Sequence, residues 1–290
     1  MVYRGALFTR ERHSYHRRLL EEEVLTLTAA GVASNADGDQ KASRLYAAHI
    51  ADALGARVRN EKLAGQTAGE RFESVCAEFA QATFLELGHL RPGTWKVEKM
   101  PGRRAASGVA RFEQYSHLAD LDEAVRMNQS LRAILGNDYG IAPDVVISRS
   151  PMPDSEINAY DELVDDTVAR KAAIRRANQP LPILHAVISC KWTLRTDRAQ
   201  NARSEALNLI RNRKGRLPHV AVVTGEPTPA RISSLALGTG DIDCVYHFAL
   251  PELVAAVDEH GADDAVDLLN TMITGNRLKD IADLPLDLAV

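Results

Sequence analysis

The sequence predicts an α/β fold, in which a central mixed β-sheet is flanked by helices and preceded by a mainly helical N-terminal part. The second half of the chain predicts the sheet, because short apolar, β-branched runs alternate there with segments of helical periodicity. Residues 1–90 instead carry apolar positions at helical spacing. With 290 residues, 45% of them hydrophobic and 26% charged, the chain has the composition of a globular protein.

Helices are expected first, over residues 10–30 and 41–58, with the polar loop SNADGDQ between them. A third helix is expected to begin near Thr67, a plausible N-cap, and to run through ERFESVCAEFAQATFLEL. A short strand over 95–100 and a helix over 112–136 complete the first half.

Four strands are expected in the second half, over residues 143–149, 185–192, 219–226 and 241–248. Helices over 199–213 and TPARISSLAL separate the later strands, which places a sheet core within 143–250 of one domain, 1–290. The segment 150–182 is long, proline-bearing and acidic at its start. Loops of that length are usually functional or partner-binding, and a solvated surface excursion is the alternative.

Several classes of protein are excluded by the sequence. No apolar run is long enough for a membrane helix, and the first residues lack the apolar core of a signal peptide. The three cysteines lie far apart without paired Cys/His spacing, which predicts reduced thiols in the cytoplasm and argues against a zinc site. Because the net charge is −4, any nucleic-acid surface must be a local patch.

Asp144, Lys191 and Glu205 form the constellation that carries chemistry. Asp144 opens one predicted strand and Lys191 closes another, and each alone is an ordinary strand-end residue. If these strands are neighbours, carboxylate and ammonium meet at one edge of the sheet, where Glu205 arrives on the following helix. Such carboxylates select Mg²⁺ or Mn²⁺, and a nearby lysine stabilises a reacting phosphate. The pattern predicts phosphodiester hydrolysis, and the usual nucleotide-loop and zinc-protease motifs are absent from the sequence.

A basic cluster beside this constellation indicates a substrate. Residues 195–216 contain seven basic side chains and two acidic ones, a pattern that is most often a solvated helix face. Its position beside the candidate site favours a polyphosphate backbone instead. Asp197 would repel phosphate, so Arg195, Asp197 and Arg198 make more sense as readers of base edges in a G·C-rich target.

The same residues resemble a known family. Pro143-Asp144, Ser189-Cys190-Lys191 and Glu205 are similar to the motif of the PD-(D/E)xK nucleases. Most members place the second acid two residues before the lysine, where this chain has Ser189, and Glu205 replaces it. That displacement resembles the restriction endonucleases that cut sites with a central CCGG. Nearly the whole chain shares segments with this group, among them SNADG, SCKWT, DRAQNARSE, NLIRNRKGRLPH, ALGTG, IDCVYHFAL and PLDLAV.

The resemblance implies a restriction-endonuclease-like core and roles for individual residues. Asp144 and Glu205 would bind metal, Cys190 would offer its backbone carbonyl, and Lys191 would be the catalytic lysine. Glu73 would be a further acid near the metals, although without the resemblance it reads as a solvent-facing helix residue.

DNA contacts are implied as well. Arg195, Asp197 and Arg198 would read the central CCGG in the major groove, and Gln66 would reach the minor groove. Asp37 and Arg231 would read the outer base pair, with a plain turn residue as the alternative for Asp37.

Within this group the match implies Mg²⁺-dependent cleavage of double-stranded GCCGGC to leave 5′-CCGG overhangs. It also implies a homotetramer of two dimers, and a DNA methyltransferase as the partner activity in the host. A two-fold dimer fits a palindrome, since one subunit reads one half-site. We interpret 150–182 as a candidate oligomerisation insertion. The alternatives are another nuclease with the same core, acting in repair or recombination, a non-catalytic DNA-binding regulator, and a metabolic α/β enzyme with a basic rim.

Overall fold

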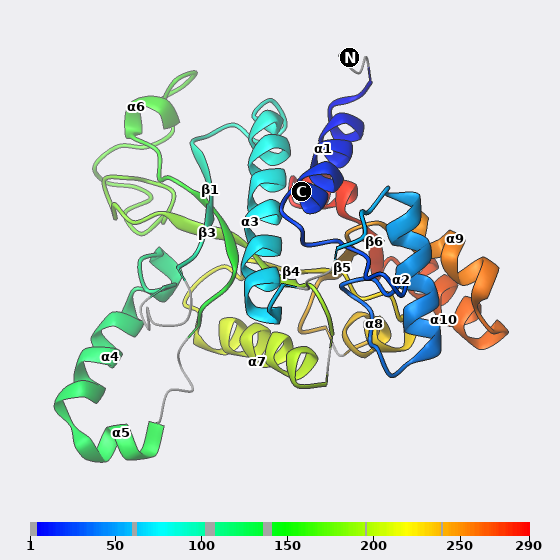
Figure 1. Cartoon of the computed structure of the whole chain (residues 1–290). Coiled ribbons are helices and arrows are strands. Elements are labelled where there is room, and N and C mark those ends of the chain that lie inside the picture. Colours follow the sequence, from blue (N-terminus) through cyan, green and yellow to red (C-terminus); the bar gives the residue numbers. More distant parts are fainter. Residues whose placement is uncertain (1–4, 60–62, 102–107, 136–140, 195, 239) are drawn as a thin grey trace.

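A computed structural model of the chain describes every residue except 1–4, 60–62, 102–107, 136–140, 195 and 239. The side chains of residues 132, 134–135 and 196–198 also lie outside the description. Within the described ranges, the strands form one sheet of six, ordered β1 to β6 as in the chain (Figure 1).

The sheet is mixed, as predicted. Three strands pair in antiparallel fashion, β1 (Trp95–Lys99) with β2 (Val145–Arg149) and β2 with β3 (Ile183–Lys191). β4 (His219–Thr224), β5 (Cys244–His247) and β6 (Leu278–Asp280) continue parallel to β3. The central strands β3 to β5 are buried along most of their length, which is why they read as apolar runs.

Three helices form the N-terminal part: α1 (Leu7–Glu21), α2 (Lys41–Ala53) and α3 (Gly65–Phe84). They confirm the predicted helices, but the first two end earlier than expected. Beyond α1, Glu23 takes a left-handed backbone conformation with φ 57°, and beyond α2 Gly55 does so with φ 74°. A residue in that conformation ends a helix, and glycine adopts it without a steric penalty.

The remaining helices are α4 (His117–Met127), α5 (Gln129–Leu135), α6 (Asp154–Ile157), α7 (Thr196–Asn212), α8 (Pro229–Ala236), α9 (Leu250–His260), α10 (Asp263–Thr274) and α11 (Leu284–Asp287). The single helix expected over 112–136 is divided at Asn128, whose side-chain oxygen accepts the N–H groups of Ser130 and Leu131 and so begins α5. α9, α10 and β6 follow the last segment for which an element was predicted.

Helices cover the sheet on both faces. α3 packs against β1, β2 and β3, and Phe72 in its middle is fully buried. α7 covers the other face, where its Ala202 and Ala206 line one small pocket together with Val187 and Val222 of the sheet. α2 packs along α9, and α4 and α5 extend away from the sheet at the lower left of Figure 1. Among the described residues, no helix is long and apolar enough to span a bilayer.

Candidate active site

Asp144 and Lys191 meet at one edge of the sheet. β2 and β3 are antiparallel with Val145 opposite Ile188, so the residue before β2 lies beside the end of β3. One carboxylate oxygen of Asp144, Oδ2, accepts the Cys190 N–H at 2.7 Å and the Lys191 ammonium at 2.9 Å. Both side chains are 16% exposed, so this ion pair is largely shielded from solvent. The convergence expected from the sequence is therefore present.

Glu205 joins this pair from the helix α7. Ser189 and Lys191 point to the same face of β3, since side chains alternate along a strand, and α7 packs on that face. The Ser189 hydroxyl lies 3.5 Å from Asp144 Oδ2 and 3.4 Å from Glu205 Oε2. The carboxylate of Glu205 thus lies next to the position that an acid on the strand itself would occupy.

Glu73 approaches the same group of side chains from α3. Its carboxylate is 3.5 Å from the ammonium of Lys99, at the end of β1. Burial and the neighbouring negative charge of Asp144 raise the pKa of Glu73, and Lys99 and Lys191 only partly offset them. A helix glutamate facing solvent would show no such effect, so the structure places Glu73 within the electrostatic reach of Asp144.

Lys191 is held as a cation. Burial alone would lower its pKa, but the carboxylates of Asp144 and Glu205 outweigh burial and raise the pKa of Lys191 above its ordinary value. The side chain therefore supplies a fixed positive charge at neutral pH, and it is a poor acceptor of a proton in this arrangement.

These side chains line one cleft of about 820 Å³. Its polar lining includes Gln66, Glu73, Lys99, Asp144, Lys191 and Glu205. With Glu70, which also lines the cleft, four carboxylates face two ammonium groups, so acidic side chains outnumber basic ones in the lining. Oxygen ligands with excess negative charge are the donor set that Mg²⁺ and Mn²⁺ prefer.

The thiol of Cys190 is buried. Hydrogen bonding with Cys76 and burial raise the pKa of the Cys190 thiol well above its ordinary value. All three cysteines are free and buried, which agrees with the reduced thiols expected from the sequence.

Asp37 and Arg231 are also brought together, although they lie far apart in the chain. They form an ion pair in a pocket of about 340 Å³ that shares Gly65 and Trp192 with the cleft. The buried carboxylate of Glu226 lies 3.8 Å behind Arg231 and accepts the Leu194 N–H at 2.9 Å. Arg231 is thereby held between two carboxylates at the wall of the pocket.

The other expected DNA contacts are only partly described. Arg195 lies outside the described residues, as do the side chains of Asp197 and Arg198, whose backbone begins α7. Gln66 lines the cleft from the first turn of α3 and donates to Glu70 at 3.3 Å. Further along the basic cluster, Arg211, Arg213, Lys214 and Arg216 are exposed.

Sequence reasoning missed Lys99 and Trp192. Lys99 donates to the Glu70 carbonyl at 2.7 Å and to the Ser74 hydroxyl at 2.9 Å, so it is anchored to α3 beside Glu73. The sequence feature that could have indicated Lys99 is its place as a charged residue near the end of a short predicted strand. The Trp192 ring separates the cleft from the Asp37 pocket, and its indole N–H has no partner within the described part of the chain. Its position directly after Lys191 was the available signal.

Known proteins resemble this chain along nearly its full length. Residues 15–290 match the family model described as NgoMIV restriction enzyme. The chain is 54% identical over 284 residues to the Type II restriction enzyme NgoMIV of Neisseria gonorrhoeae, which covers 98% of this chain and 99% of that protein. The chain belongs to the NgoMIV restriction enzyme family. The solved complex of restriction endonuclease PspGI with substrate DNA aligns over 98% of this chain and 92% of that chain, at 12% identity and a TM-score of 0.28, too low to support an argument.

As a member of the NgoMIV family, the chain is a Type II restriction endonuclease, and DNA is its substrate. The regulator, metabolic-enzyme and repair-nuclease alternatives are therefore wrong. Restriction endonucleases generally depend on a metal, in agreement with the acidic cleft.

Proposed function

We propose that this enzyme hydrolyses double-stranded DNA at GCCGGC, after the first G, and leaves 5′-CCGG overhangs. The meeting of Asp144, Lys191 and Glu205 in one cleft is the observation that carries the catalytic part of the proposal. The target sequence rests on the 54% identity to the NgoMIV enzyme and on the recognition segment DRAQNARSE.

We propose Mg²⁺ as the cofactor, with Mn²⁺ as a substitute. The carboxylates of Asp144, Glu205 and Glu73 and the backbone carbonyl of Cys190 would hold it. The donor set supports this fit, because these carboxylates line one cleft and oxygen ligands are what Mg²⁺ and Mn²⁺ prefer. When bound, such an ion stabilises the charge that develops on the scissile phosphate.

The other cleft residues would position the reacting groups and the metal-binding carboxylates. Lys191, fixed as a cation by Asp144, would attract the scissile phosphate and orient the attacking water. The Cys190 N–H and the Ser189 hydroxyl would hold the carboxylates of Asp144 and Glu205 in place. Lys99 would keep Glu73 turned toward the cleft.

For recognition, Arg195, Asp197 and Arg198 would read CCGG. Asp197 and Arg198 belong to the first turn of α7, the next helix after the strand that carries Lys191. Gln66 would enter the minor groove, and Asp37 and Arg231 would read the outer base pair. A palindrome of this length requires a two-fold dimer, and we propose that two dimers form a homotetramer. We further propose that the enzyme acts in the cytoplasm and that a DNA methyltransferase of the host protects the same sites.

The experiment is cleavage of matched plasmids that carry a single GCCGGC or a single ACCGGT, with end-sequencing of the products. Wild-type protein with Mg²⁺ should cut only the first plasmid, and the Lys191→Ala variant should bind it and lose roughly 100-fold or more of the cleavage rate. The control is Lys96→Ala, a 67% exposed lysine on β1 that should leave the rate unchanged. Equal cutting of both plasmids would disprove the outer base pair, and full activity of Lys191→Ala would disprove the site.

A further inference from the structure

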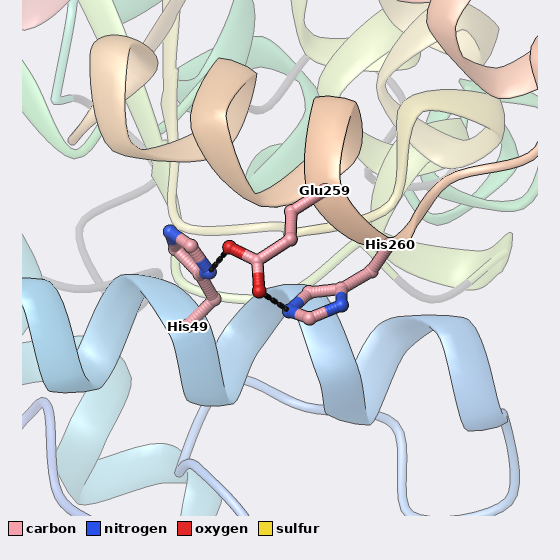
Figure 2. Close-up of side chains that lie close together, drawn as sticks. All are labelled: His49, Glu259 and His260. Carbon is pink, nitrogen blue, oxygen red and sulfur yellow. Dashed lines mark ion pairs between the residues drawn. The ribbon is translucent and has the colours of Figure 1, made fainter.

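Two histidines and a glutamate meet on the surface, away from the acidic cleft. His49 lies on α2, whereas Glu259 and His260 are the last residues of α9. Figure 2 shows the Glu259 carboxylate between the two imidazole rings, with one oxygen toward each. His49 Nδ1 is 3.4 Å from Glu259 Oε2, and His260 Nε2 is 3.6 Å from Glu259 Oε1.

Both distances are longer than hydrogen bonds and fall in the range between two ligands of one metal ion, although each imidazole faces a different carboxylate oxygen. N–H···O bonds in proteins fall at about 2.7–3.2 Å. Ligands of a tetrahedral Zn²⁺, at about 2.0–2.2 Å from the ion, lie roughly 3.3–3.6 Å from each other. One ligand atom from each of the three residues lies within 4.8 Å of the others, so a small rotation of exposed side chains would complete such a set.

The scaffold behind the three residues is fixed. α2 packs on α9 through fully buried side chains, including Ile50 on α2 and Leu253 and Val257 on α9. Where α9 ends, a β-carbon on Gly261 would approach the Tyr46 hydroxyl to 3.2 Å and the Val257 carbonyl to 2.4 Å. Glycine is therefore required after His260 mainly by the Val257 carbonyl of α9 itself, and the packing of α2 on α9 sets the spacing of the two imidazoles.

Electrostatics and access both favour a cation here. The C-terminal end of a helix carries partial negative charge on its last carbonyl groups, and α9 ends at His260. The His49 and His260 side chains are 24% and 29% exposed, and Glu259 is 62% exposed. An ion can reach the three ligands from solvent, and water can fill its fourth position.

We propose that His49, Glu259 and His260 form a transition-metal site that binds Zn²⁺ and fastens α2 to α9. Two imidazoles and one carboxylate select Zn²⁺ over Mg²⁺, which prefers oxygen ligands alone. The site is separate from the acidic cleft and does not depend on the proposed DNA target. The spacing of His and Cys in the sequence argued against zinc, because these ligands come from distant segments. Since α2 directly follows the loop that holds Asp37, bound Zn²⁺ also stabilises the base of that loop.

The test is a Zn²⁺ titration of the full chain without an affinity tag, in excess Mg²⁺ so that the oxygen ligands of the cleft are occupied. We expect one saturable equivalent and, at a 100-fold excess over Kd, a rise of a few degrees in Tm. Co²⁺ in place of Zn²⁺ should give the intense visible bands of a tetrahedral ion. The exposed His89→Ala variant, outside the site, should behave as wild type in all three measurements.

His49→Ala should lose the saturable equivalent, the Tm shift and the Co²⁺ bands. Glu259→Gln keeps the size of an exposed side chain, so it should fold normally and bind Zn²⁺ roughly tenfold or more weakly. Neither variant should alter DNA cleavage in Mg²⁺, so a failure here is distinct from a failure of the proposed activity. Unchanged Zn²⁺ binding in both variants, or no saturable binding in the wild type, would overturn the site.

Discussion

The proposed active site differs from the usual PD-(D/E)xK motif, which the sequence resembles, in the position of a single acidic side chain. Ser189 stands two residues before Lys191, and its hydroxyl contacts both Asp144 at 3.5 Å and Glu205 at 3.4 Å. A carboxylate could therefore reach the same region from either the strand or the helix. We propose that the requirement is for the charge at that place, whichever element supplies it.

The exchange of these two residues tests this idea. Glu205→Ser should reduce the cleavage rate by roughly 100-fold or more, because it removes a charge aimed at the reacting phosphate. The double variant Glu205→Ser with Ser189→Glu should cleave at least tenfold faster than Glu205→Ser alone, measured in single-turnover cleavage with Mg²⁺. The uncharged Ser189→Gln in the same Glu205→Ser background is the control and should restore nothing. Equal rates for the Glu and Gln double variants would show that charge position is not the requirement.

His247 predicts how stability depends on pH. Its ring is fully buried in β5, Nδ1 accepts the Ala249 N–H at 3.1 Å, and Nε2 donates to the Glu226 carbonyl at 3.2 Å. Burial lowers the pKa of His247 to about 4. The folded state therefore excludes a proton that the unfolded chain takes up below about pH 6.5, so stability falls as the pH falls from 6.5 to 4.

The expected loss from this histidine is about 3 kcal/mol at most across that interval. Urea unfolding at pH 7, 6, 5 and 4 measures it. His247→Gln should be less stable at pH 7 but should show a shallower decline, whereas the exposed His89→Gln should follow the wild type. Parallel declines for His247→Gln and wild type would contradict the assignment of this pH dependence to His247.

At the scale of elements, local patterns predicted most of the sheet and its helices. Apolar β-branched runs marked β2 to β5, and strand-end positions were enough to single out Asp144 and Lys191. The end of α2 also had a readable signal in Gly55, whereas Glu23 beyond α1 is not a residue that usually takes a left-handed conformation. α9 was also predictable, because Leu250, Leu253 and Val257 recur at helical spacing.

Other features depend on contacts between distant segments, which no local pattern encodes. Lys99 reaches Glu73 only because α3 lies across β1. β2 and β3 are neighbours in the sheet although residues 150–182 separate them in the chain. His49 and His260 meet only because α2 packs along α9. The type of chemistry was thus predictable from the residue types, but the complete set of residues that line the site was not.

Gly225, between β4 and α8, shows how tightly these elements meet. A β-carbon there would lie 2.3 Å from the Trp192 ring and 2.8 Å from the Trp192 carbonyl. Trp192 packs on Phe72 of α3 and lines both the cleft and the Asp37 pocket. Gly225→Ala should therefore displace the ring and reshape both surfaces.

The expected cost of Gly225→Ala is about 1–3 kcal/mol of stability, typical of overpacking in a dense core. Its cleavage rate should fall further than that stability loss explains at a temperature where the variant remains folded. Urea unfolding and cleavage assays on the same preparation separate the two effects. Gly88→Ala is the matched control, since a β-carbon there would meet nothing within 4 Å. A Gly225→Ala protein with wild-type cleavage would show that Trp192 does not shape the DNA surface.

For the whole molecule, the insertion 150–182 is our candidate for the contact of the proposed tetramer. It has an ordered interior: Arg175 is 4% exposed and binds both carboxylate oxygens of Asp154, each at 2.7 Å. Its surface nevertheless presents apolar side chains, with Tyr160 fully exposed, Leu163 63% exposed and Val168 48% exposed. We propose that these exposed apolar side chains, held on a segment with an ordered interior, take part in a contact between chains.

If the proposed tetramer forms through this surface, charges placed on it should divide the tetramer into dimers. Tyr160→Asp combined with Leu163→Asp leaves the Asp154–Arg175 pair intact, and both side chains are exposed, so the chain should still fold. Multi-angle light scattering should show the mass of four chains for the wild type and of two for the double variant, because association would bury unpaired carboxylates. Met127→Asp, an 85% exposed apolar residue on α4, is the control and should remain a tetramer. A tetrameric double variant would mean that 150–182 is a surface excursion and that four chains associate through another face.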